Sequence, residues 1–130
     1  MTETTMRQKL MKAHNTSDCR IVRIENSAEI GTPDLYYRHK CGSGWIELKF
    51  VHKPKEGSTV TVNFRPGQLQ WILRETYLGG KVLLLTVDQF SLWRSFKGSR
   101  INYKYSYDEF CGENGIWYQV SDIPGRLTLP

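Results

Sequence analysis

The sequence predicts one α/β (α+β-like) domain in which a mixed β-sheet is flanked by helices. Two segments, near the N-terminus and after residue 66, carry apolar residues at the 3.6-residue spacing of amphipathic helices. Strand-length segments rich in β-branched and apolar residues lie around positions 19–26, 35–51 and 81–88. The predicted order is therefore helix, three strands in a meander, helix and strand, and such elements pack as a sheet covered by helices.

The first predicted helix spans residues 2–14. Thr2 is a favourable N-cap residue, and Met6, Leu10 and Ala13 recur at helical spacing. A strand follows from Cys19, because "CRIVRIEN" is rich in β-branched residues.

The next two strands form a predicted hairpin. The segments "DLYYRHK" and "GWIELKFV" flank the turn-forming "CGSG". A loop of two residues, Cys41 and Gly42, or of four residues, 41–44, would place Asp34 on the same face as Glu47 and Lys49. With the two-residue loop, Asp34 would lie directly opposite Lys49 and diagonal to Glu47.

The second helix and the last strand follow a loop rich in Lys, Pro and Gly, with a short extended piece at residues 59–64. Pro66 marks the start of the helix, and Gly79 with Gly80 marks its end. Its apolar stripe is predicted to consist of Leu69, Ile72, Leu73 and Thr76. The segment "KVLLLTVD" is a strand of the kind that is buried on both faces. A helical crossover implies that this strand runs parallel to "WIELKF".

Residues 89–130 are aromatic and basic, with a short helix expected at residues 107–113 and an irregular tail. We therefore expect a single domain, residues 1–130, with a core of about residues 2–88 and a C-terminal extension of residues 89–130.

The composition, 39% hydrophobic and 24% charged, is typical of a soluble globular protein. The three cysteines are far apart and have no C-x-x-C spacing, which argues against a disulfide framework or a zinc site. No signal peptide or membrane-length apolar run is present, so we expect a cytoplasmic protein without a membrane partner. The net charge of +5 favours a polyanionic partner such as nucleic acid, although many basic proteins bind none.

The charged residues of the hairpin suggest a metal site. Asp34 and Glu47, together with a backbone carbonyl, would form an oxygen-rich site for Mg²⁺. Such a site activates a water for attack on a phosphodiester, and Lys49 would orient that water or stabilise the developing charge. The alternative is that Asp34 belongs to a turn at "GTPD" and that Glu47 and Lys49 form an exposed charge pair.

Pro33-Asp34, followed thirteen residues after the aspartate by Glu47-Leu48-Lys49, resembles the motif of the PD-(D/E)XK nuclease superfamily. The segments "GTPDL" and "WIELK" are especially similar to its phage-type branch, the virus-type replication-repair nucleases, and to related Holliday-junction resolvases. The resemblance covers roughly residues 2–88 and implies a restriction-endonuclease-like core.

Gln68, three residues before the aromatic Trp71, also matches this family, whose members carry a glutamine on the corresponding helix. The resemblance implies that Gln68 supports the metal or DNA near the site; alternatively, it is an exposed residue beside Trp71. The other implied roles are metal ligands at Asp34, Glu47 and the Leu48 carbonyl, and a catalytic Lys49.

Many relatives add a glutamate from the first helix. Glu3 is the better candidate here, because it falls on the inward stripe of Met6 and Leu10. An acid in a first helical turn is also favoured by the helix dipole alone, without any catalytic role. Glu25 is the other candidate, and it could instead pair with Arg23 or Lys49.

Basic residues lie where a DNA backbone could run, and neighbouring aromatic residues could stack on unpaired bases. The predicted nucleic-acid contacts are Lys53, Lys55, Arg65, Arg94, Lys97 and Arg100. The alternative is a solvated loop with aromatic residues in the core.

The resemblance implies a Mg²⁺-dependent DNA endonuclease, with Mn²⁺ as a substitute metal. It further implies a homodimer that acts on branched DNA, such as a four-way junction, in phage recombination, repair or replication in the host cytoplasm. The alternatives are a general single-strand or duplex nuclease and a non-catalytic nucleic-acid-binding module. The intact Asp34, Glu47 and Lys49 argue against the module.

Overall fold

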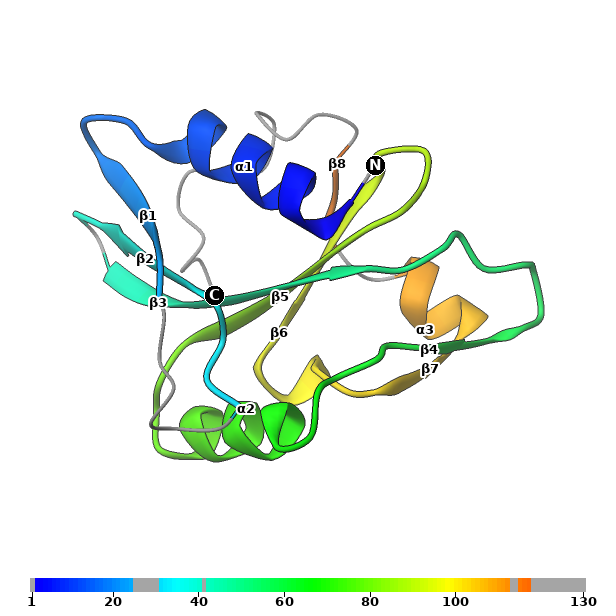
Figure 1. Cartoon of the computed structure of the whole chain (residues 1–130). Coiled ribbons are helices and arrows are strands. Elements are labelled where there is room, and N and C mark those ends of the chain that lie inside the picture. Colours follow the sequence, from blue (N-terminus) through cyan, green and yellow to red (C-terminus); the bar gives the residue numbers. More distant parts are fainter. Residues whose placement is uncertain (1, 25–30, 41, 113–114, 118–130) are drawn as a thin grey trace.

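The computed structural model describes residues 2–24, 31–40, 42–112 and 115–117. Within these residues a six-stranded sheet has the strand order β1-β2-β3-β5-β6-β8, and a two-stranded sheet pairs β4 with β7 (Figure 1). The strands are β1 (Cys19–Arg23), β2 (Leu35–His39), β3 (Gly42–Phe50), β4 (Thr59–Thr61), β5 (Val82–Val87), β6 (Trp93–Lys97), β7 (Lys104–Ser106) and β8 (Gly115–Trp117). Only β3 and β5 pair in parallel in this sheet, so the predicted mixed sheet is confirmed.

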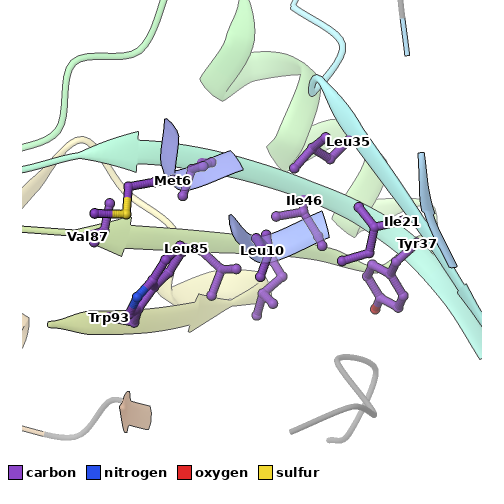
Figure 2. Packing of buried hydrophobic residues seen from close by; sticks show 11 residues of the cluster. Met6, Leu10, Ile21, Leu35, Tyr37, Ile46, Leu85, Val87 and Trp93 are labelled. Carbon is purple, nitrogen blue, oxygen red and sulfur yellow. The ribbon is translucent and has the colours of Figure 1, made fainter. Parts of the chain in front are cut away.

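Helix α1 (Glu3–His14) covers one face of the large sheet, as Figure 1 shows. The Thr2 side chain accepts a hydrogen bond from the backbone N–H of Thr5 at 3.1 Å, so the predicted N-cap is confirmed. Figure 2 shows Met6 and Leu10 among the side chains of the sheet, including Trp93. Fully buried side chains of this size stabilise a fold by roughly 1.5–3 kcal/mol each, and they fix α1 on the sheet.

The predicted β2–β3 hairpin is confirmed, but its predicted turn is wrong. His39 pairs with Gly42, which leaves two residues, at positions 40 and 41, between the strands. Gly44 therefore lies within β3 and not in a turn. A Cβ atom on Gly44 would lie 2.7 Å from the carbonyl oxygen of Lys81, so only glycine allows this close approach of the chain.

The observed register changes the predicted partner of Asp34. The ladder ends at Leu35 opposite Ile46, and the next positions along the two strands are Asp34 and Glu47. Asp34 thus faces Glu47 and not Lys49. The loop still has an even number of residues, so the three charged residues lie on the face that was predicted for them.

Helix α2 (Gln68–Tyr77) connects β3 to β5 and covers the opposite face of the sheet from α1 (Figure 1). All six residues of β5 are buried, as expected for a central strand that runs parallel to β3. The helix begins at Gln68, after Gly67 at φ 84°, and its buried residues are Gln68 and Ile72. Leu73 is 45% exposed, so its predicted place on the inward stripe is wrong. The inward face carries the polar Gln68 beside Ile72, which the apolar pattern does not show.

A glycine joins the segment before Asp34 to the start of α2. Gly31 has φ 93°, and a Cβ atom there would lie 2.7 Å from the carbonyl carbon of Gly67. The backbone of the "GTPD" segment therefore packs directly on the first turn of α2. This contact holds Asp34 close to Gln68.

The segment after residue 88 adds strands β6 and β8 to the large sheet and forms α3 (Tyr107–Gly112), close to the predicted short helix. The 3₁₀ helix η1 (Gly98–Arg100) links β6 to β7. Strand β6 was not predicted, because its sequence, "WRSFK", includes two charged residues. Phe96, Tyr105 and Phe110 from this region belong to a second apolar cluster, which also contains Ile72 of α2. No helix in the described part of the chain is long and apolar enough to cross a membrane.

Candidate active site

The predicted site residues meet where the β2–β3 hairpin approaches the first turn of α2. Side chains alternate along β3, so Leu48 points into the cluster under α1 while Glu47 and Lys49 face α2. Gln68 is the first residue of α2, and Asp34 directly precedes β2. Glu47 and Gln68 are 1% and 0% exposed, and Lys49 is buried as well, so the suggested exposed charge pair is not what forms.

The Gln68 amide connects Glu47 to Lys49. Its Nε2 atom donates to both carboxylate oxygens of Glu47, at 3.1 Å each. Its Oε1 atom accepts a hydrogen bond from Lys49 Nζ at 2.9 Å and another from the backbone N–H of Arg65 at 2.8 Å. The donors and the acceptor around the amide thus fix its orientation, and Gln68 is not a surface residue.

Lys49 lies against both polar and aromatic groups. Its Nζ atom is 3.7 Å from Glu47 Oε1 and 5.6 Å from the centre of the Phe64 ring. A buried ammonium needs compensating negative charge and hydrogen-bond acceptors, and Glu47 and Gln68 supply them. The lysine head group is therefore held in one place next to the Glu47 carboxylate.

Asp34 lies between two arginines. Arg65 Nη2 is 3.3 Å from Asp34 Oδ1, and Arg7 Nη1 is 3.9 Å from Asp34 Oδ2. The Arg65 side chain is 61% exposed, whereas that of Arg7 is 12% exposed. Arg7 was not predicted as a site residue. The available signal was its position four residues after Glu3, which places both on the same face of α1.

Glu47 has an altered affinity for its proton. Burial is the main cause and raises the pKa of Glu47 to about 7. The charge of Lys49 lowers this pKa, and the charge of Arg65 does so to a smaller degree. The carboxylates of Asp34 and Glu3 raise it further. The partly buried Glu3 is thus close enough to act on Glu47, whereas Glu25, the other predicted acid, lies outside the described residues.

The donor groups fit a divalent cation held through oxygen. Asp34 and Glu47 occupy facing positions on neighbouring strands, so their two carboxylates can approach the same cation. The third predicted oxygen is the backbone carbonyl of Leu48, the residue between Glu47 and Lys49 on β3. The described residues contain no group of three His, Cys, Asp or Glu side chains that could hold a metal. Two carboxylates and one carbonyl would leave the remaining positions of a hard cation such as Mg²⁺ to water.

The predicted nucleic-acid contacts divide into two groups. Five are exposed side chains: Lys53, Lys55, Arg65, Lys97 and Arg100. Arg94 is only 5% exposed, and its Nη1 atom is 3.5 Å from Asp88 Oδ2. Its guanidinium carbon also lies 5.2 Å from the centre of the Phe110 ring. In this structure Arg94 is part of the core and does not belong to the exposed basic surface.

No protein-family model and no curated protein sequence matches the chain. A solved structure does match: Hjc, a Holliday junction resolvase from the archaeal hyperthermophile Archaeoglobus fulgidus. The likeness has a TM-score of 0.55 at 14% sequence identity and covers 83% of this chain and 88% of that one. The chain thus has the mixed α/β, restriction-endonuclease-like fold of that resolvase.

Proposed function

We propose that this protein is a Mg²⁺-dependent DNA endonuclease that acts on branched DNA such as a four-way junction. The observation that carries the proposal is the buried Glu47–Gln68–Lys49 network beside Asp34. Burial of a carboxylate and an ammonium is costly, and such costs are most often found where a site has to be preorganised for chemistry. The fold of a Holliday junction resolvase supports the same reaction class.

Asp34 and Glu47, with the Leu48 carbonyl, are the groups that would hold the metal. Bound there, Mg²⁺ would supply positive charge to the phosphate oxygens and make a bound water more acidic. In the overall reaction a water oxygen forms a bond to phosphorus, one backbone P–O bond breaks, and the leaving oxygen takes up a proton. The site therefore has to stabilise negative charge that develops on the phosphate.

Lys49 is the residue of this chain that would stabilise this negative charge. Its Nζ atom is held by Gln68 at 2.9 Å and lies beside Glu47, so it requires little reorganisation before it stabilises the phosphate. Gln68 positions this ammonium and the Glu47 carboxylate relative to each other. Arg65 is exposed and attached to Asp34, so its guanidinium is placed to contact the phosphate backbone close to the metal ligands.

The proposed preference for branched DNA rests on the similarity to the solved structure of Hjc, which is a Holliday junction resolvase. Symmetric cutting of a four-way junction requires two sites, and we therefore include a homodimer in the proposal. The motifs "GTPDL" and "WIELK" support a phage-type enzyme that works in recombination, repair or replication in the host cytoplasm. Mn²⁺ is expected to replace Mg²⁺. A nuclease of single-stranded or duplex DNA uses the same chemistry and is separated from a resolvase by substrate preference alone.

A non-catalytic nucleic-acid-binding module is the second candidate. The contacts of Asp34 with Arg65 and Arg7 favour it, because these arginines neutralise the aspartate without any metal. In such a module the charged network would serve the stability of the fold.

The test is cleavage of labelled single strand, linear duplex, flap and four-way junction, each with Mg²⁺, Mn²⁺ and EDTA. The variants are Asp34→Asn, which removes a metal ligand, and Asp108→Asn, a matched change at an exposed position of α3. We expect metal-dependent cutting of the junction by the wild type and by Asp108→Asn, and none by Asp34→Asn. Junction binding without cutting in any metal by all three proteins would instead establish the binding module.

A further inference from the structure

Two arginines lie directly opposite each other on the first two strands. Arg20 of β1 pairs with Arg38 of β2, and Arg38 pairs with Ser43 of β3, so the three residues form one row across the sheet. Alternation along the strands puts this row on the same face as Asp34 and Glu47. Both arginines are exposed.

Within the described part of the chain, no acidic side chain compensates this pair of charges. Like charges at directly opposed positions of two strands destabilise a sheet. In the part of the chain that the structure describes, neither Arg20 nor Arg38 forms a salt bridge. The nearby Asp18 already forms an ion pair with Lys40, whose Nζ atom is 3.4 Å from Asp18 Oδ1. These four side chains carry a net charge of +2, so the natural partner of the row is an anion from outside the fold.

Hydroxyl groups lie beside the arginines. Ser43 lies opposite Arg38 on β3, and Tyr36 is two positions before Arg38 on the same face of β2. Arg20, Arg38 and Ser43 also line an open hollow of about 640 Å³, with the hydroxyls of Thr16 and Ser17. Guanidinium and hydroxyl groups that converge in this way are the groups that proteins use to contact phosphate oxygens.

The row continues the candidate active site along the sheet. Arg38 is four residues after Asp34, which corresponds to roughly 13 Å at about 3.3 Å per strand residue. Between them lie Tyr36 and Trp45, whose ring centroids are 5.0 Å apart. A DNA strand that lies along this face would therefore meet the row with a phosphate only a few nucleotides from the one at the metal ligands.

We propose that Arg20 and Arg38, with the hydroxyls of Ser43 and Tyr36, form a second phosphate-binding site that holds the DNA backbone roughly 13 Å along β2 from Asp34. The choice of DNA as the anion rests on the proposed function, whereas the anion site itself rests on the two opposed arginines, which form no salt bridge within the described residues. The site would fix the direction in which a DNA strand crosses the sheet. None of these residues takes part in the cleavage step.

The test measures binding of a labelled four-way junction and a linear duplex by fluorescence anisotropy in EDTA, over a range of salt concentrations. The double variant Arg20→Gln/Arg38→Gln is compared with Lys9→Gln/Lys12→Gln, which removes the same charge from exposed positions of α1. We expect the arginine variant to reduce the slope of log K against log salt by about 1.8, since each phosphate contact contributes about 0.9. The lysine variant should leave the slope at the wild-type value.

Equal slopes in the two double variants, or no DNA binding by the wild type, would overturn the proposal. Thermal melting separates loss of binding from loss of fold, and the arginine variant should melt no lower than wild type because it removes a repulsion. If the double variant does not fold, each single arginine variant should reduce the slope by about 0.9. Selective loss of binding in a protein that never cuts DNA would support this site and reject the nuclease proposal. Normal DNA cutting by the arginine variant with an unchanged salt slope would reject this phosphate site and support the nuclease proposal.

Discussion

Gln68 Nε2 lies 3.1 Å from each carboxylate oxygen of Glu47, and the same side chain accepts a hydrogen bond from Lys49. A neutral amide that is 0% exposed thus joins a buried acid to a buried base across two secondary-structure elements. The stability of the fold and the geometry of the candidate site depend on the same residue.

Replacement of Gln68 by alanine should therefore destabilise the protein strongly. The change leaves the Glu47 carboxylate and the Lys49 ammonium without their amide partner, and such losses cost about 1–3 kcal/mol for each buried group. We expect a decrease of roughly 2–5 kcal/mol in the free energy of unfolding, measured by chemical denaturation. Gln70→Ala on the exposed side of the same helix is the control, with a change within about 0.5 kcal/mol. A loss at position 68 no larger than at position 70 would contradict the network.

The stability of the metal-free protein should fall as the pH rises from about 4.5 to about 7. The pKa of Glu47 is raised from 4.5 to about 7 in the folded protein, so the folded state binds more protons than the unfolded state within this window. Below the window both states are protonated and above it both are ionised, so the contribution of Glu47 changes only in between. A shift of this size corresponds to about 3 kcal/mol.

Denaturation curves at pH 5 and pH 8, for wild type and Glu47→Gln, measure this contribution. The wild type should lose about 3 kcal/mol more than the variant between the two pH values. Saturating Mg²⁺ favours the ionised carboxylate and should reduce the difference. A wild type that follows the variant across the window would show that burial does not perturb Glu47.

Replacement of Arg65 by glutamine should strengthen metal binding in the absence of DNA. Arg65 Nη2 lies 3.3 Å from Asp34 Oδ1 and competes with a cation for that carboxylate. The arginine is mostly exposed, and such pairs are worth about 0.2–1 kcal/mol, so the gain in affinity should be at most about fivefold. Calorimetric titration with Mn²⁺ measures it, and Lys53→Gln, an exposed charge without this contact, is the matched control. Weaker metal binding by Arg65→Gln would mean that the arginine assists the metal instead.

Alanine substitution of one leucine in each helix can test which helix positions face the core. Leu10 of α1 is 0% exposed, whereas Leu73 of α2 is 45% exposed. Leu10→Ala should cost about 2–5 kcal/mol of unfolding free energy through loss of packing and the cavity it leaves. Leu73→Ala should change it by less than about 0.5 kcal/mol. A large loss of unfolding free energy in Leu73→Ala would mean that Leu73 packs inward, as the apolar pattern of the sequence suggests for α2.

Much of the site could be predicted from the sequence because its geometry depends on the regular spacing of side chains along strands and helices. Glu47 and Lys49 share a face of β3 because side chains alternate, and the helical crossover made β3 and β5 parallel. The register was predicted incorrectly because Gly42 and Gly44 look like turn residues, whereas both pair with β2. The glycine at position 44 instead allows the close approach of the Lys81 carbonyl, and Lys81 is distant in the chain.

Other features depended on tertiary contacts that no local pattern encodes. Strand β6 contains Arg94, and a charged residue argues against a buried strand unless its partner, here Asp88, is known. The contact of Arg7 with Asp34 depends on how α1 lies across the sheet. The predictions were thus right where one element decides the outcome, and wrong or incomplete where two elements have to meet.

The burial of β5 has a consequence for synthesis on the ribosome. The three residues of the network and Asp34 are all translated by position 68. Glu47, however, pairs with Leu84 of β5, and the other edge of β5 is covered by β6, which ends at Lys97. A nascent chain lacks these strands for about 1.5–6 s after Gln68 is added, at typical elongation rates of about 5–20 residues per second. During that interval the hairpin has an open, hydrophobic edge of the kind that aggregates. The charged side chains thus emerge before the strands that assemble them into a site.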